Sequence, residues 1–142
     1  YRTTLPDLVV AERLSERVAL LKLFPGLSFE LYQGLFNREK VDAIVIETYG
    51  SGNAPSHPIL QKLVRHFIEQ GGIVVNVTQC SSGQVVQGKY ETSGFFQRMG
   101  VLSGGDLTTE AAVTKLMYCL GLNLCKEETI QLFQKNIVGE IS

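Results

Sequence analysis

Two short polar clusters carry most of the side chains in this sequence that could hold a ligand. The first, Thr48 to Asn53, has the sequence Thr-Tyr-Gly-Ser-Gly-Asn, and the second, Thr78 to Ser82, has the sequence Thr-Gln-Cys-Ser-Ser. Their hydroxyl, amide and thiol groups suit hydrogen bonding of a small polar ligand better than proton transfer. The glycines allow a ligand to approach the backbone closely. The alternative is that the Thr and Asn residues only stabilise turns and helix ends, and the composition favours neither interpretation.

The motifs of several common catalytic and nucleotide-binding sites are absent. A G-x-G-x-x-G dinucleotide motif starting at Gly50 would need a glycine at position 55, where the chain has Pro55. Neither a phosphate-loop Gly-Lys-Ser/Thr nor a G-x-S-x-G nucleophile motif occurs. Of the two histidines, His66 lies on the polar face of its predicted helix, and His57 has no evident carboxylate partner. We therefore predict no catalytic residue, no cofactor and no metal in this chain.

The composition is that of an ordinary globular domain, with 44% hydrophobic residues and a net charge of −1 over 142 residues. No basic cluster indicates nucleic acid as a partner, and no apolar segment approaches the roughly 18 residues that span a membrane. The three cysteines, Cys80, Cys119 and Cys125, show no C-x-x-C spacing, which argues against a disulfide framework and a zinc site. Reduced cysteines predict a cytoplasmic protein.

Each polar cluster follows an apolar run that is typical of a buried parallel strand. Val41 to Ile46 precedes the first cluster, Ile73 to Val77 precedes the second, and an amphipathic helix capped by Ser56 separates them. Because the carboxyl ends of parallel strands meet at one edge of a sheet, we expect the clusters to converge there. The other predicted elements are a strand at 17–24, a short helix at 28–37, a helix at 92–100, a strand at 101–102, a helix capped by Thr108 that buries Val113, Leu116, Met117 and Leu120, and a helix at 127–135.

This order of elements predicts an α/β fold with about four parallel strands flanked by helices. Residues 1–16, of which the first 14 show no clear period, are interpreted as a linker or an arm from a preceding domain. Residues 17–142 are then interpreted as one α/β domain.

Several blocks of the sequence resemble the C-terminal domain of the bacterial, cytosolic (type I) L-asparaginases. The three blocks are 48–55, 75–83 with Tyr90 and Thr92 downstream, and 104–116. The turn Phe24-Pro25-Gly26 also resembles the family's aromatic-Pro-Gly turn after the first strand. The resemblance extends from about Val18 to Ser142, in the order and spacing of the family. It implies a flavodoxin-like, three-layer domain.

The resemblance implies an enzyme that hydrolyses L-asparagine to aspartate and ammonia and works as a homodimer or tetramer. The family's catalytic threonines and aspartate–lysine pair belong to an N-terminal domain that is missing here, so this chain alone is predicted to be inactive. The family's C-terminal domain borders the active sites of neighbouring subunits, and in some bacterial members it helps to form an allosteric asparagine site. The predicted substrate, effector or interface residues are Thr48, Tyr49, Gly50, Gly52, Asn53, Thr78, Gln79, Cys80 and Tyr90.

Glu47 departs from the family pattern, because regulated bacterial members can carry an arginine ahead of the Tyr-Gly turn. A glutamate there would repel the carboxylate of an amino-acid effector, which predicts a poor asparagine sensor unless Glu47 points elsewhere and pairs with a basic neighbour. Two other functions remain open. One is the asparaginase-like subunit of an archaeal glutamyl-tRNA amidotransferase, and the other is a free-standing regulatory module that binds an amino acid.

Overall fold

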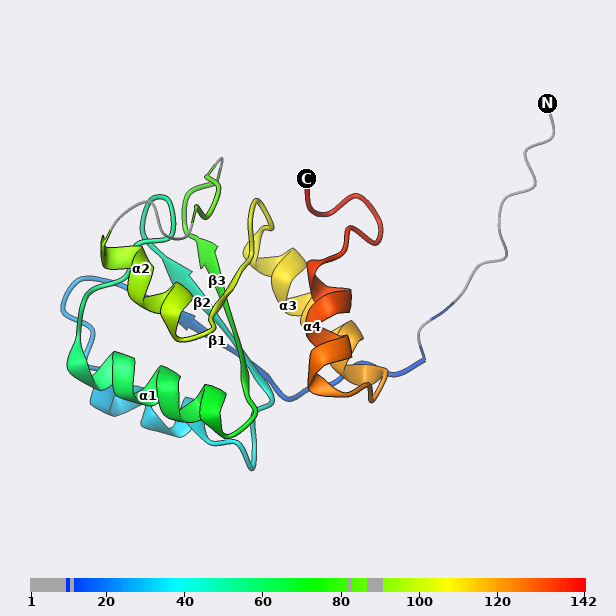
Figure 1. Ribbon diagram of the computed structural model, residues 1–142, viewed down its shortest axis with the longest axis horizontal. Coiled ribbons are helices and arrows are strands. Elements are labelled where there is room, and N and C mark those ends of the chain that lie inside the picture. The colour runs from blue at the N-terminus through cyan, green and yellow to red at the C-terminus, as the bar shows by residue number, and fades with distance from the viewer. Residues whose placement is uncertain (1–9, 11, 82, 87–90) are drawn as a thin grey trace.

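Four parallel strands form one sheet, and helices pack on both of its faces (Figure 1). The computed structural model describes residues 10, 12–81, 83–86 and 91–142. In chain order the elements are β1 (Val18–Lys22), the 3-10 helix η1 (Phe29–Phe36), β2 (Ala43–Thr48), α1 (Pro58–Glu69), β3 (Ile73–Thr78), α2 (Glu91–Arg98), β4 (Leu102–Ser103), α3 (Thr109–Gly121) and α4 (Lys126–Gln134). The predicted α/β fold with four parallel strands is confirmed.

The two central strands, β2 and β3, are buried along their whole length, as their apolar sequences predict. They pair in register from Ala43 opposite Ile73 to Thr48 opposite Thr78, so both strands end at the same level. Strand β2 begins two residues later than predicted. Asp42 just before it is held by the side chains of Arg17 and Arg38, each with an N–O distance of 2.7 Å. The hydrogen bond from the Arg17 guanidinium lowers the pKa of the Asp42 carboxyl.

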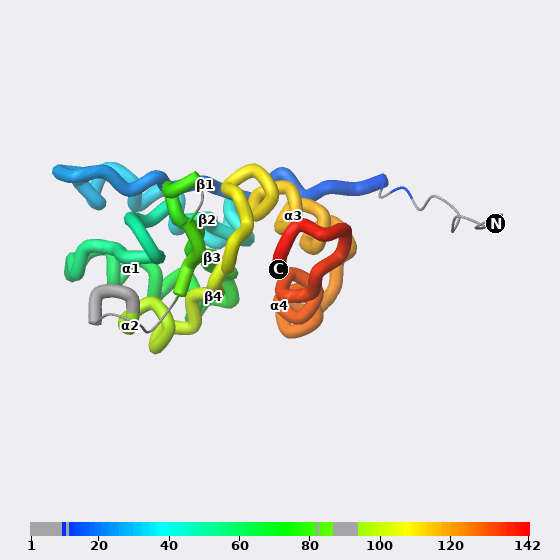
Figure 2. Tube along the Cα trace, turned by 90° about the horizontal axis from the view of Figure 1, so that it is seen from above, coloured from blue at the N-terminus to red at the C-terminus, as the bar shows by residue number. Residues whose placement is uncertain are grey.

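The strands lie in the order β1-β2-β3-β4, the same as their order in the chain. Right-handed crossovers between consecutive strands therefore place η1, α1 and α2 on one face, and α3 and α4 cover the other face (Figure 2). The result is the expected three-layer arrangement. Because the strand order never reverses in the described sheet, it does not form the crevice in which doubly wound sheets bind ligands.

The cap of α1 differs from the sequence prediction, whereas the cap of α3 agrees with it. The side chain that caps α1 is His57, whose Nδ1 accepts a hydrogen bond from the Ile59 N–H at 3.3 Å, whereas the predicted cap Ser56 accepts from the side chain of Gln61. The capping role of His57 gives it a structural function. The predicted cap of α3 is confirmed, since Thr108 accepts from the Ala111 N–H at 3.2 Å.

The buried face of α3 is also different from the predicted one. Besides Leu116, the buried residues of α3 are Ala112, Lys115 and Cys119, whereas the other predicted positions are half-buried, namely Val113, Met117 and Leu120. The helix packs against the sheet on one side and α4 on another, so its apolar residues divide between two contacts.

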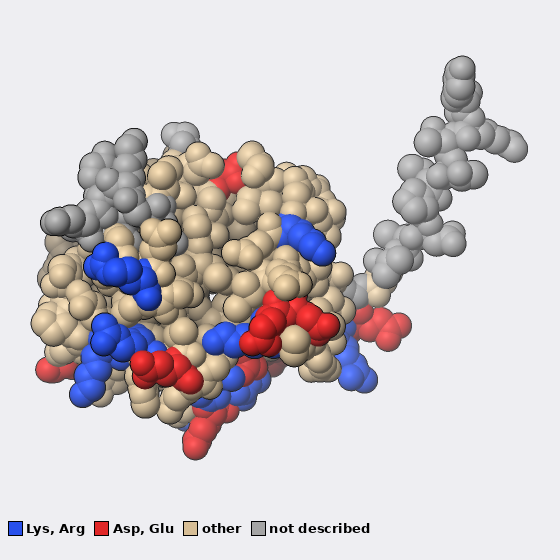
Figure 3. Space-filling view, viewed as in Figure 1, with Lys and Arg blue, Asp and Glu red and all other residues tan. Residues whose placement is uncertain are grey.

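In the part of the chain that the structure describes, no helix is both long and apolar enough to cross a membrane. On the face drawn in Figure 3, acidic and basic side chains are interspersed, and neither sign dominates a patch.

Candidate functional site at the carboxyl edge of the sheet

The first polar cluster forms a tight turn directly after β2. The backbones of Tyr49 and Asn53 exchange hydrogen bonds of 2.9 Å and 2.8 Å, and the Gly52 N–H also donates to the Tyr49 carbonyl. Gly50 and Gly52 have φ angles of +50° and +102°, which other residues adopt only with strain. The glycines at these two positions therefore allow the turn, and the turn holds Tyr49 and Asn53 at its two ends.

A buried side-chain network fixes this turn to the sheet. The Thr48 hydroxyl donates to Asn76 Oδ1 at 2.6 Å and lies 3.1 Å from the Val77 carbonyl, while Asn76 Nδ2 donates to the Gly52 carbonyl at 3.0 Å. Thr48 and Asn76 are both completely buried. Asn76 thus joins β2, β3 and the turn, and it is a site residue that the sequence prediction does not include.

The second cluster binds the first one through the Thr78 hydroxyl and through the backbone N–H of Gln79, which donates to the Thr48 carbonyl at 2.9 Å. The Thr78 hydroxyl donates to the Gly50 carbonyl. The Gln79 side chain donates to the carbonyls of Leu23 at 2.6 Å and Glu47 at 3.0 Å, just after β1 and near the end of β2. The two clusters therefore lie together, as expected, but their threonine hydroxyls and the glutamine amide are engaged in internal hydrogen bonds.

A third segment completes the edge. The Val85 N–H donates to the Gly105 carbonyl and the Gly104 N–H to the Asn76 carbonyl, both at 2.8 Å. A methyl group on Gly52 would lie only 2.7 Å from Val85, so this segment packs directly on the turn. We call the assembly of residues 48–53, 76–80, 83–86 and 103–105 the edge platform. It brings parts of all three family-like blocks into one hydrogen-bonded unit.

Glu47 points away from the turn and toward the N-terminus of α3. Its carboxylate accepts a hydrogen bond from the Thr109 hydroxyl at 2.6 Å and pairs with the Lys22 ammonium at 3.4 Å. The Glu47 side chain is only 11% exposed, whereas that of Lys22 is 62% exposed. The interpretation of Glu47 as a residue that points elsewhere and pairs with a basic neighbour therefore agrees with the structure.

The remaining predicted site residues differ in how exposed they are. Tyr49 and Asn53 are half-buried in the turn, and Cys80 is exposed with a free thiol. Tyr90 lies outside the described residues. Among the described residues no group of His, Cys, Asp and Glu side chains could hold a metal ion. Within the edge platform the Thr48 hydroxyl donates to the Asn76 side chain and the Thr78 hydroxyl donates to the Gly50 carbonyl, so both threonines hold the platform together.

The sequence of this chain is similar to those of known proteins. The sequence model of the "Glutaminase/Asparaginase C-terminal domain" family matches residues 17–133. L-asparaginase 1 of Escherichia coli strain K12 is 33% identical over 136 residues, which cover 96% of this chain and 40% of that protein. One subunit of the glutamyl-tRNA(Gln) amidotransferase of Archaeoglobus fulgidus is 34% identical over 141 residues, 99% of this chain and 32% of that protein.

A solved structure agrees with these sequence matches. The crystal structure of L-asparaginase I from Vibrio cholerae is 37% identical, superposes with a TM-score of 0.85, and matches 94% of this chain and 40% of its own. The chain thus spans well under half the length of these relatives, and the resemblance to type I L-asparaginases is confirmed. With a match over most of its length, the chain belongs to the glutaminase/asparaginase C-terminal domain family.

Proposed function

We propose that this chain is the C-terminal domain of an L-asparaginase that hydrolyses L-asparagine to L-aspartate and ammonia. On this proposal residues 1–16 are the linker or arm from an N-terminal catalytic domain, and residues 17–142 are the C-terminal α/β domain. The complete protein works as a homodimer or tetramer in the cytoplasm. Relatives named L-asparaginase support the reaction, and the free cysteines of the described chain agree with the compartment.

The observation that carries this proposal is the edge platform. It joins segments of the three family-like blocks but contains no nucleophile paired with a base in its described part. Such a platform can border an active site that another domain completes. Within it, we assign the positioning of the turn to Thr48, Gly50, Gly52, Thr78 and Gln79, and contact with substrate, effector or a neighbouring subunit to Tyr49, Asn53, Cys80 and Tyr90.

The test is an ammonia-release assay on the complete polypeptide that contains this chain, with L-asparagine and L-glutamine as substrates. We expect hydrolysis of L-asparagine by the complete polypeptide and none by the 142-residue chain. Activity of the isolated chain that persists after removal of contaminating host enzyme would contradict the division of roles. A complete polypeptide that leaves L-asparagine intact would contradict the reaction itself.

The amidotransferase relative supports a second function, because it matches 99% of this chain at an identity close to that of the bacterial asparaginase. In that case ammonia release would depend on a partner protein, and the complete polypeptide alone should release no ammonia in the assay above. A free-standing amino-acid-binding module is tested by calorimetry of L-asparagine with the 142-residue chain, where we expect no binding.

Residue 47 makes a prediction about regulation. Because it is a glutamate, it offers no positive group to the carboxylate of an amino-acid effector at the turn, and its own carboxylate is bound by Thr109 and Lys22. We expect the rate to depend hyperbolically on the L-asparagine concentration. A sigmoidal dependence that becomes hyperbolic in Thr78→Val would show that an effector site exists.

A further inference from the structure

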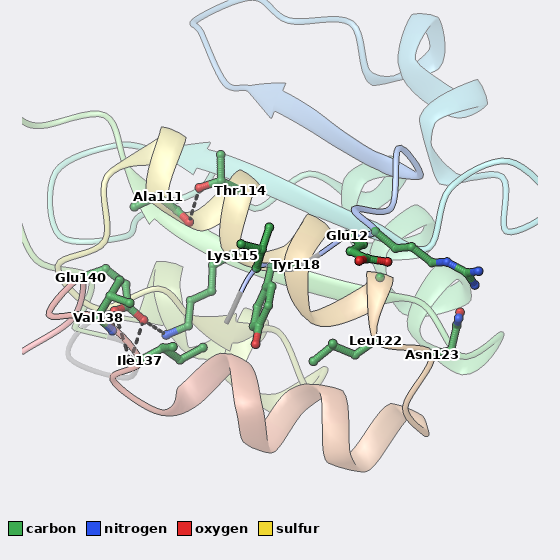
Figure 4. Close-up of a pocket in the computed structure, with 13 residues that line it drawn as sticks. Glu12, Ala111, Thr114, Lys115, Tyr118, Leu122, Asn123, Ile137, Val138 and Glu140 are labelled. Atoms are coloured by element: carbon green, nitrogen blue, oxygen red, sulfur yellow. Dashed lines mark hydrogen bonds and ion pairs between the residues drawn. The ribbon is translucent and has the colours of Figure 1, made fainter. Parts of the chain in front are cut away.

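Two hollows in the described surface differ in how their charged groups are used. The larger, of about 900 Å³, is a groove along α3, and its Lys115 and Glu140 pair with each other (Figure 4). The smaller, of about 490 Å³, lies between α1 and α2, and we call it the α1–α2 pocket. It is lined by Ser56, Gln61, Arg65, Ile68, Glu69, Phe95, Arg98 and Met99. Its volume lies in the range of small-molecule sites.

The α1–α2 pocket is built by one face of each helix. Positions 61, 65, 68 and 69 of α1 and positions 95, 98 and 99 of α2 line it, and these spacings place them on one side of their helices. Both helices pack on the same face of the sheet (Figure 1). Phe95 is buried in the core there, and Ile68 and Met99 pack against that core. The core therefore holds the apolar side of the pocket in place.

Three charged side chains line the pocket without forming an ion pair. Arg65, Glu69 and Arg98 make no ion pair or side-chain hydrogen bond with any residue that the structure describes. Arg65 and Glu69 are four residues apart on α1, a spacing at which opposite charges often pair. The two arginines that flank Asp42, by contrast, are both paired with it. The three charges of the pocket thus remain available to a ligand.

The neighbouring residues favour a bound polar molecule. A methyl group on Gly94 would lie 3.2 Å from Nη1 of Arg98, so the glycine leaves room for this guanidinium against α2. Across the pocket, Gln61 Nε2 donates to Ser56 Oγ at 3.2 Å. Because that oxygen accepts this hydrogen bond, the Ser56 hydroxyl can still donate one and Gln61 Oε1 can still accept one. The pocket therefore offers both donors and acceptors.

The charges of the pocket select the chemistry of the ligand. A guanidinium can bind a carboxylate through two parallel hydrogen bonds, so two arginines suit a ligand with two carboxylates. The Glu69 carboxylate would repel a simple anion, but it would accept hydrogen bonds from an ammonium group. An acidic amino acid has two carboxylates and one ammonium group. Its single net negative charge also complements the single net positive charge of the three side chains.

We propose that the α1–α2 pocket binds a free acidic amino acid, L-aspartate or L-glutamate. Arg65 and Arg98 each bind one carboxylate, and Glu69 binds the ammonium group. None of the residues that line the pocket belongs to the edge platform, so this is a separate site. L-aspartate is the product of the proposed reaction, but the inference does not rest on that reaction, because binding is measured without turnover.

The test is an NMR titration of the isotope-labelled 142-residue chain with L-aspartate and L-glutamate. We expect one or both to shift the amides of α1 and α2 saturably, with a dissociation constant of about 1 mM or lower. L-asparagine and L-glutamine lack the second carboxylate and should bind at least roughly tenfold more weakly, because a charge-assisted hydrogen bond is lost. Succinate and glutarate lack the ammonium group and should be weakened similarly, because they meet Glu69 without a partner for it.

Variants of the three charged residues test their separate roles. Arg65→Gln and Arg98→Gln should each weaken binding of the acidic amino acid by roughly tenfold or more. Glu69→Gln should weaken it too but should strengthen the binding of succinate and glutarate, because the repelling carboxylate is gone. A merely structural role of Glu69 would not reverse the preference in this way. Lys62→Gln is the matched control, since Lys62 is exposed on α1 outside this pocket and its loss should change affinity less than about twofold.

Four results would overturn the proposal. The first is the absence of saturable shifts with either acidic amino acid up to about 10 mM. The second is equally tight binding of L-asparagine and L-glutamine. The third is equally tight binding of inorganic phosphate, which would show a general anion site. The fourth is an equal loss of affinity in Lys62→Gln and Arg65→Gln. Failure of the ammonia-release assay with intact binding of the acidic amino acid would count against the proposed function alone.

Discussion

The edge platform and the α3 groove differ in which side chains they leave exposed. The α3 groove lies along α3, between residues 10, 12 and 13 on one side and residues 137, 138 and 140 on the other. At the edge, polar residues that suggest ligand binding point inward, and the hydroxyls of Thr48 and Thr78 bind a side chain or backbone carbonyls. At the groove, apolar side chains stay exposed, and Val138 is 85% accessible. Polarity in the sequence is therefore a poor guide to contact with a partner. What matters is whether the folded chain has already bound the group.

An ion pair lies beside the edge platform and another lies at the groove, and the two pairs differ in burial. Lys22 and Glu47 at the edge have side chains 62% and 11% exposed, whereas Lys115 and Glu140 at the groove are 4% and 14% exposed. An exposed pair contributes little because water competes with it, but breaking a buried pair leaves a charge without compensation.

The largest expected effect follows from this contrast. Lys115→Met should lower the free energy of unfolding by roughly 3 kcal/mol, because Glu140 loses its cation and the Lys135 carbonyl loses its donor. Lys22→Met, the matched change at the edge, should lower it by at most about 1 kcal/mol. Urea unfolding of both variants measures the difference. Equal losses would show that burial does not separate the two pairs.

Removal of the platform's central amide should have the next largest effect. Asn76→Leu leaves the Gly52 carbonyl without its donor and the buried Thr48 hydroxyl with only the Val77 carbonyl at 3.1 Å, which should cost about 2–3 kcal/mol. Thr114→Val, which removes a hydroxyl bonded only within α3, should change stability by less than about 0.5 kcal/mol. Thermal unfolding measures the difference, and equal unfolding midpoints for the two variants would contradict this prediction.

A smaller effect is expected from the turn itself. Gly52→Ala should destabilise the chain by roughly 1–3 kcal/mol, since φ is +102° and the new methyl group would lie 2.7 Å from Val85. Gly26→Ala is the control, because φ is +84° there but no atom lies within 4 Å of the new methyl group. Its loss should be near 1 kcal/mol. If Gly26→Ala is as damaging as Gly52→Ala, contact with Val85 is not what fixes the turn.

The most subtle difference concerns pH. The hydrogen bond from Lys115 lowers the pKa of Glu140 from 4.5 to about 2. A lowered carboxyl pKa contributes stability that is fully present above the unfolded value and is lost as the pH falls toward the folded value. The stability gap between the wild-type chain and Glu140→Gln should therefore narrow from pH 4.5 to about 2. A constant gap over this range would exclude the ion pair as its cause.

The sequence predicted the centre of the sheet well, because β2 and β3 are short runs rich in β-branched residues between turn signals. The convergence of the two polar clusters also followed from the parallel strand order. The role of Asn76 was harder to predict, because it lies inside the apolar run of β3, where only its exceptional polarity marked it. A buried amide of this kind needs partners, and those partners come from another strand and another turn.

Lys115 shows a second reason for failure. A lysine on an amphipathic helix is normally placed on the solvated face, and the predicted buried face of α3 accordingly left it out. The structure buries it because Glu140 and the Lys135 carbonyl, both beyond the helix, supply its partners. This contact forms because residues 135–140 pack back onto α3. The periodicity of the helix sequence carries no information about residues outside the helix.

The N-terminal arm, which packs on α3 through residues 13–15, must wait for that helix during synthesis. The Ser15 N–H donates to the Met117 carbonyl, and a side chain at Gly121 would collide with the Arg13 carbonyl, 2.2 Å away. The arm leaves the ribosome early, whereas its docking helix is made only after all four strands. Until then one whole face of the nascent sheet has no cover, and contacts between such distant segments form slowly. We expect that apolar face, with Val45, Val75 and Val77, to stay exposed until α3 has been made and can pack on it.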